Sequence, residues 1–168
     1  MLAPVIVDAA LAGAWKRDSH LHGEEHWRCV ASSGLWLAGQ DEGADRAVVF
    51  CFGLLHDTRR ENESYDPGHG ARAAVYAREL AAADALPLTG DQLELLCHAI
   101  ELHSDGLVSE DDTVAACWDA DRLHLPRVGI DPRQDLFSTA HACGPVPLAA
   151  AALLREAPPA WLELLEIV

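Results

Sequence analysis

The stretch that decides the fold spans residues 45–57 and reads Asp-Arg-Ala-Val-Val-Phe-Cys-Phe-Gly-Leu-Leu-His-Asp. Residues 47–55 are apolar or glycine on every helical face, which is typical of a helix buried at the centre of a bundle. Periodicity alone would also permit a buried strand, but the neighbouring segments have helical patterns and favour the helix. The stretch ends in His56-Asp57, so it is predicted to carry two metal-competent side chains into the protein interior.

Helical patterns also dominate the rest of the chain, and strand-like alternation is scarce. Proline, glycine and short polar caps mark where each helix begins or ends. We predict helices over about residues 2–15, 19–38, 45–57, 67–86, 89–104 and 109–126, then a short segment near 135–142 and two short helices separated by Pro158-Pro159.

The length of 168 residues suits one domain, and the sequence shows no internal repeat or low-complexity linker. We expect a single all-α domain over residues 1–168, a bundle of about six to eight helices. Its motif-bearing core covers about residues 20–130. The helices of 131–168 are expected either to pack on that core or to form a homodimer contact.

Charge and composition exclude several classes of partner. The chain has 12 Lys and Arg against 27 Asp and Glu, a net charge of -15, which argues against binding a nucleic-acid polymer or an anionic membrane. No apolar run reaches the roughly 18 residues of a membrane span, and the N-terminal run lacks the basic leader of a signal peptide. The five cysteines form no Cys-x-x-Cys pair, so we expect a cytoplasmic protein. Nine histidines in so acidic a chain suggest metal binding.

Three predicted helices carry side chains that could converge on a metal ion. His26 lies on an apolar helix face, and His56-Asp57 ends the buried stretch. Asp121 projects from an apolar stripe, and a buried carboxylate needs either a core arginine or a metal ion as its partner. Asp119 points about 200° away from Asp121, so a surface or supporting role is expected for it. Helical bundles build metal sites from inward side chains on separate helices.

Three short motifs occur in order along the chain. They are His-Trp-Arg-Cys-Val at 26–30, Leu-Leu-His-Asp at 54–57 and Asp-Ala-Asp-Arg-Leu-His at 119–124. Together they resemble the HD superfamily of metal-dependent phosphohydrolases. The resemblance implies the HD-domain fold, and it makes four residues the metal ligands: His26, His56, Asp57 and Asp121. Asp57 is counted as a catalytic residue as well.

Two further histidines, His69 and His103, match positions that bind a second metal ion or a phosphate in some branches of this family. His69 lies at a helix start, where backbone N–H groups also favour anions, and His103 is predicted to face inward. The short spacing between His56 and His69 predicts one metal ion per chain rather than two. The mixed nitrogen and oxygen ligands suit a divalent Mn, Fe, Co, Ni or Zn ion.

The polar loop after the buried stretch supplies the remaining candidates. Arg59 and Arg60 are expected to contact a phosphate, or to form a solvated pair that balances nearby acidic residues. Glu61 is the candidate general base that aligns the attacking water, with solvation or pairing to Arg60 as the alternative. His22 either lines the pocket beside His26 or caps the preceding turn.

The function implied by the resemblance is hydrolysis of a small phosphate ester, with a nucleotide as one candidate, by attack of a metal-activated water on phosphorus. Two alternatives stay open. One is a di-iron oxygenase of the same superfamily that acts on a small organic substrate through histidines such as His69 and His103. The other is a non-catalytic module that binds a metal or a nucleotide.

Overall fold

Helices account for all of the regular secondary structure in the computed structural model, which describes residues 2–168. The α-helices are α1 (Val5–Ala12), α2 (Glu24–Ala38), α3 (Arg46–Leu55), α4 (His69–Ala82), α5 (Gly90–Leu102), α6 (Asp112–Leu123), α7 (Pro145–Glu156) and α8 (Trp161–Leu165). Three short 3-10 helices connect α6 to α7: η1 (Leu125–Val128), η2 (Gln134–Leu136) and η3 (Ala140–Ala142). The predicted all-α bundle is confirmed.

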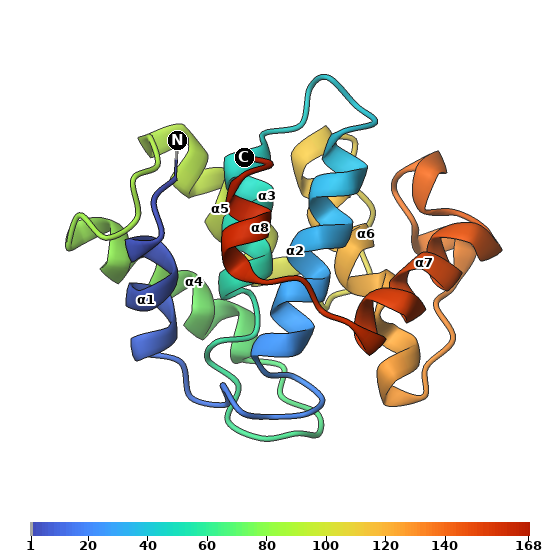
Figure 1. Ribbon diagram of the computed structural model, residues 1–168, viewed down its shortest axis with the longest axis horizontal. Coiled ribbons are helices and arrows are strands. Elements are labelled where there is room, and N and C mark those ends of the chain that lie inside the picture. The colour runs from blue at the N-terminus through green and yellow to red at the C-terminus, as the bar shows by residue number, and fades with distance from the viewer. Residues whose placement is uncertain (1) are drawn as a thin grey trace.

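The stretch 45–57 forms the buried helix that its composition predicts. Asp45 caps α3, because its carboxylate accepts hydrogen bonds from the backbone N–H groups of Ala47 and Val48 at 2.9 and 3.1 Å. Helices α2, α5 and α6 pack around α3, as Figure 1 shows. Every residue from 48 to 55 is buried, which explains why this helix has no polar face.

Backbone contacts at two glycines join the helices that carry the candidate ligands. A Cβ atom added to Gly53 of α3 would lie 2.5 Å from both Cα and Cβ of Ala31 on α2. A Cβ atom added to Gly70 of α4 would lie 2.7 Å from the carbonyl oxygens of Ile100 and Glu101 on α5. Because a glycine lies at each crossing, the backbones approach more closely than a side chain there would allow. This holds for α2 with α3 and for α4 with α5.

Helix α4 begins at His69, later than the Pro67 start that the sequence predicts. Asp66 does not cap this helix. Its two carboxylate oxygens each accept a hydrogen bond from Arg72 at 2.7 Å, and Oδ2 also accepts one from the backbone N–H of Glu61 at 2.8 Å. The ion pair closes the loop between α3 and α4 and fixes the direction in which its side chains point.

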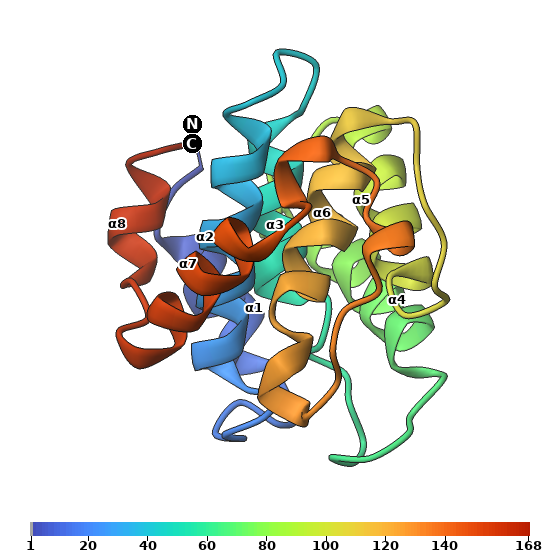
Figure 2. The same cartoon turned by 90° about the vertical axis from the view of Figure 1, so that its right-hand side faces the viewer.

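The C-terminal helices cover the core. Helix α7 lies across α2 and α6, and α8 follows it beside α2 (Figure 2). The ring of Trp161 in α8 packs on Phe50 of α3, with centroids 5.6 Å apart, and its Nε1 donates to Glu24 at 3.0 Å. The tail thus packs on the core, and the homodimer contact stays a prediction. Among the residues described, none of the helices is both long enough and apolar enough to cross a membrane.

Replacing Gly53 with alanine is expected to lower the free energy of unfolding by about 1–3 kcal/mol, because the new methyl group would overlap Ala31. Gly90→Ala in α5 is the matched control, since no atom lies within 4 Å of its added Cβ, and it is expected to be neutral or slightly stabilising. Urea unfolding of both variants measures the difference. Equal stability of the two would contradict the close crossing of α2 and α3.

Candidate metal centre

His56 and Asp57 follow the last turn of α3 and are 0% and 2% exposed. The Nδ1 atom of His56 lies 3.2 Å from the carbonyl oxygens of both Phe52 and Gly53. Because a carbonyl oxygen can only accept, Nδ1 carries the proton of the neutral ring and donates it. Nε2 therefore keeps a free lone pair that points into the interior, as a metal ligand requires.

The first group of candidate ligands joins three helices. Nε2 of His26, on α2, lies 3.3 Å from Nε2 of His56 and 3.3 Å from Oδ1 of Asp121, on α6. Oδ2 of Asp57 lies 3.9 and 3.8 Å from the nitrogens of His26 and His56. Ligand atoms about 2.1 Å from one ion are roughly 3.0–3.4 Å apart. The ligand atoms of His26, His56 and Asp57 are thus close to the spacing that a single ion needs, and Asp121 lies beside the two histidines.

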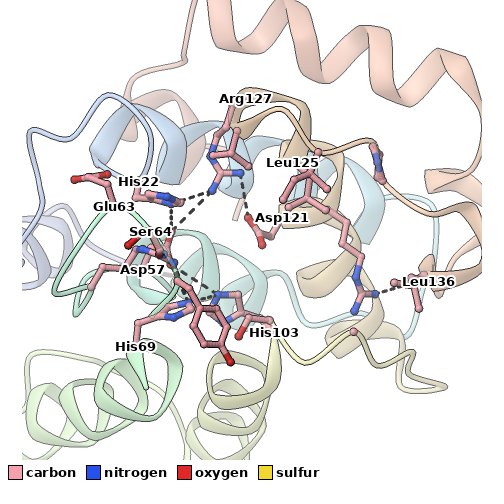
Figure 3. A pocket seen from close by; sticks show the side chains of 18 of the residues that line it. His22, Asp57, Glu63, Ser64, His69, His103, Asp121, Leu125, Arg127 and Leu136 are labelled. Carbon is pink, nitrogen blue, oxygen red and sulfur yellow. Dashed lines mark hydrogen bonds and ion pairs between the residues drawn. The ribbon is translucent and has the colours of Figure 1, made fainter. Parts of the chain in front are cut away.

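The second group contains Asp57, His69 and His103. Oδ1 of Asp57 lies 3.2 Å from Nε2 of His69 and 3.8 Å from Nε2 of His103. The Nδ1 of His69 donates to the carbonyl of Asp66, and the Nδ1 of His103 donates to that of Ile100 at 2.7 Å. Asp57 therefore presents Oδ2 to the first group and Oδ1 to the second. Figure 3 shows Asp57 together with His69 and His103 in the pocket.

Two imidazole nitrogens face each other in this cluster. Nε2 of His69 and Nε2 of His103 are 2.9 Å apart, while both Nδ1 atoms are already donors. Without an ion, a proton on Nε2 of His103 can be shared with Nε2 of His69, and a metal ion held by both nitrogens would displace that proton. Oδ1 of Asp121 is also buried without a hydrogen-bond partner. The residues present thus fit a divalent cation.

The protonation states of these side chains suit metal binding. Burial lowers the pKa of His26 well below its usual value and that of His56 to about 4. Burial alone would raise the pKa values of Asp57 and Asp121, but the imidazoles of His56 and His26 hold both well below their usual range. His103 differs: burial disfavours its charged form, but the nearby carboxylate of Asp57 raises its pKa, so a metal ion bound there must displace a proton. Neutral imidazoles and ionised carboxylates are the forms that bind metals.

Two arginines reach the cluster. Arg60, which the sequence predicts as a phosphate contact, has Nη1 3.4 Å from Oδ1 of Asp57. Arg127 of η1 was not predicted. Its guanidinium lies 4.0 Å from Asp57 and 3.8 Å from Asp121, and its Nε donates to the carbonyl of Leu21 at 2.7 Å. Both guanidiniums line the pocket, where they could donate to a phosphate. Figure 3 shows Arg127 beside His22 and Asp121.

The structure does not bring Arg59 or Glu61 to the cluster. The guanidinium of Arg59 lies 3.7 Å from the ring centroid of Tyr76 and 4.9 Å from that of Trp15, in a separate surface depression. The carboxylate of Glu61 is exposed and lies 3.7 Å from Arg72. The ion pair that closes this loop turns both side chains away from the site where the sequence predicts a phosphate contact and a general base.

His22 reaches the site from a turn that the sequence predicts as helix. Helix α2 begins at Glu24 rather than near residue 19, and the backbone N–H of His22 donates to the Ser19 hydroxyl at 3.0 Å. The Nδ1 atom of His22 lies 3.2 Å from Oδ2 of Asp57. Of its two predicted roles, the structure therefore favours the one in the pocket.

Asp119 is fully buried and takes the supporting role that was one of its two predicted alternatives. Its carboxylate accepts backbone hydrogen bonds from Ser138 at 2.9 and 3.0 Å and from Thr139 at 2.7 Å. It also lies 3.4 Å from Arg122. Asp119 thus fixes the segment after η2, while Asp121, on the other side of α6, faces the cluster.

The cluster opens into a pocket of about 490 Å³. Four arginines and three carboxylates line it: Arg60, Arg122, Arg127 and Arg133 with Asp57, Glu63 and Asp121. The pocket thus gathers arginines in a chain whose net charge is -15, although Asp119 and Asp135 neutralise two of them, Arg122 and Arg133. It suits a small anion, whereas the chain as a whole repels large ones.

No family model, curated protein or solved structure matches this chain. The resemblance to the HD superfamily therefore rests on the three motifs. A helical protein with a buried His and Asp cluster that could hold a metal ion is compatible with an HD domain.

His124 gives the metal-free protein a measurable pH dependence. The ring is fully buried, Nε2 lies 2.9 Å from the Ser33 hydroxyl, and burial lowers the pKa to about 3. The unfolded chain, with a pKa of about 6.5, takes up this proton first. The neutral His124 ring therefore contributes fully to the free energy of unfolding above pH 6.5, and this contribution falls as the pH drops toward 3.

When the pH is lowered from 7 to 5, the free energy of unfolding of the wild-type protein is expected to fall by about 2 kcal/mol because of His124. His124→Gln lacks the titrating ring, so it should lose about 2 kcal/mol less than the wild type over this interval. Urea unfolding of both metal-free proteins at the two pH values measures the difference. Identical pH dependences would show that His124 is not held in its neutral form.

Proposed function

We propose that this protein is a metal-dependent phosphohydrolase that acts on small phosphate esters. In this proposal His26, His56, Asp57 and Asp121 hold one divalent transition-metal ion, and Asp57 is shared with a second ion held by His69 and His103. This proposal of two ions differs from the sequence prediction of one ion per chain, and the metal content of the protein decides between them. The compartment in which it acts is expected to be the cytoplasm, and a homodimer is a further possibility to test.

One observation carries the proposal. The two carboxylate oxygens of Asp57 face two separate groups of imidazole nitrogens, at 3.8 Å from His56 and 3.2 Å from His69. In the second group the Nε2 atoms of His69 and His103 lie 2.9 Å apart, and both Nδ1 atoms donate to carbonyl oxygens, so both rings turn Nε2 toward the same point. A carboxylate that bridges two ions is the arrangement of two-metal hydrolytic sites.

Hydrolysis forms a bond between a water oxygen and phosphorus and breaks the ester P–O bond, releasing an alcohol and phosphate. A divalent ion, when bound, lowers the pKa of a water toward neutrality and polarises a phosphoryl oxygen. Arg60 and Arg127 supply the remaining positive charge, because both line the pocket beside Asp57. Their fixed guanidiniums would orient the phosphate and stabilise the charge that builds up on it.

Metal content tests the arrangement directly. Purified wild-type protein is expected to bind about two divalent ions per chain, His103→Gln about one, and Asp57→Asn almost none, because Asp57 contributes to both groups. Asp84→Asn, which changes an exposed carboxylate, is the control and should bind as the wild type does. Elemental analysis with circular dichroism as a check of folding gives the result. A folded wild-type chain that binds no Mn, Fe, Co, Ni or Zn would refute the proposal.

Turnover tests the roles of the arginines. On a panel of phosphomonoesters, Arg60→Ala and Arg127→Ala are each expected to lower kcat/KM by about 10- to 100-fold, since each removes a charged hydrogen bond to the phosphate. Arg59→Ala and Glu61→Ala should stay within about threefold of the wild type, because both side chains lie outside the pocket. A larger loss in Glu61→Ala than in Arg127→Ala would restore Glu61 as the general base.

The two-group arrangement also favours the di-iron oxygenase as a second candidate, because four histidines and two carboxylates provide enough ligands for two irons. Oxygen uptake by iron-loaded protein in the presence of small organic substrates distinguishes the two enzymes. The hydrolase consumes no oxygen and turns over phosphate esters. A protein that binds its ions but does neither would be the non-catalytic module.

A further inference from the structure

The pocket has two chemically different parts. Its floor carries the candidate ligands and two fixed arginines. Its outer part has an apolar side, here called the apolar wall, formed by Leu125, Val128, Ile130, Pro132 and Leu136. Figure 3 shows Leu125 and Leu136 on one side of the pocket and Glu63 and Ser64 on the other. A ligand whose phosphate lies on the floor must place its organic part beside this wall.

Hydrogen bonds to side chains of α6 hold the apolar wall in place. The guanidinium of Arg122 donates to the carbonyl of Leu136 at 2.6 Å and also to that of Leu107. Asp119, one turn before Arg122 on α6, accepts the backbone N–H groups of Ser138 and Thr139, just beyond the wall. The helix that provides Asp121 therefore also holds the wall in place, so the distance between floor and wall is set by α6.

An exposed aromatic ring lines the same pocket. Tyr65 is 87% exposed and belongs to the loop between α3 and α4, next to Ser64. An aromatic ring this exposed gains free energy if a flat apolar group covers it. The pocket thus has an aromatic ring from one loop and the apolar wall from another segment, with the metal centre beneath.

Two charged side chains of the pocket lining already have partners. Glu63 accepts a hydrogen bond from the Ser19 hydroxyl at 2.7 Å. Arg133 is paired with Asp135, with Nε 3.1 Å from a carboxylate oxygen. A sugar or polyol placed against the apolar wall would set its hydroxyl groups beside apolar side chains, where they would lose hydrogen bonds to water without replacing them.

We propose that the pocket selects phosphomonoesters whose organic part is flat and largely apolar, held between Tyr65 and the apolar wall, over sugar and polyol phosphates. This inference rests on the proposed function for the position of the phosphate. It adds the class of substrate, which the metal centre does not specify.

The experiment separates binding from turnover. Isothermal titration calorimetry of metal-loaded protein compares phenylphosphonate with methylphosphonate, which cannot be hydrolysed as esters and share the phosphonate group. The phenyl compound is expected to bind at least about tenfold more tightly. Tyr65→Ala and Ile130→Ser should each reduce this affinity ratio by about three- to tenfold, whereas Tyr65→Phe, which keeps the ring, should retain it.

Val75→Ser is the control, because it removes an exposed apolar side chain outside this pocket. Turnover of 1-naphthyl phosphate and glycerol phosphate is measured in parallel, and the ratio of their kcat/KM values should follow the affinity ratio. Equal affinities for the two phosphonates, no binding of either, or a ratio that Tyr65→Ala and Ile130→Ser leave unchanged would overturn the inference. A preserved affinity ratio without hydrolysis of any ester would support the inference and refute the hydrolase.

Discussion

The site depends on one buried carboxylate. Asp57 is 2% exposed, and imidazole nitrogens approach it from five histidines, each at 3.9 Å or less: His22, His26, His56, His69 and His103. An ionised carboxylate in a dry interior is costly unless cations or donors surround it. Four of these rings lie at helix ends: two at the starts of α2 and α4, and two just after the ends of α3 and α5. The ends of these four helices therefore meet around the negative charge of Asp57.

Most of the fold could be predicted from the sequence because apolar patterning and caps determine helices locally. The uniformly apolar 47–55 stretch predicts the central helix, and Thr89 caps α5 in the structure as its sequence suggests. The prediction of the α4 start fails because an ion pair competes with the cap. Asp66 binds Arg72 instead of capping α4, and nothing in the local sequence distinguishes these two roles.

Site residues could likewise be predicted where a helix positions them, but not where a loop does. His26, His56 and Asp121 are positioned by helices, so helical phase and motif order identify them, and the structure brings them together. Side chains on loops follow no such period. Adjacent residues Arg59 and Arg60 diverge because the loop turns between them, and Arg127 reaches the cluster from η1 without any motif to mark it.

The contact between Gly53 and Ala31 affects which metal ion the site can hold. Because α2 and α3 touch through their backbones, the separation of His26 and His56 is set by the main chain and cannot adjust by rotation of intervening side chains. A pair of donors at a fixed separation tolerates only a narrow range of ionic radii, as the difference between rigid and flexible cation sites shows. The selectivity for a metal ion would then depend on Gly53, a residue that has no side chain with which to bind the ion.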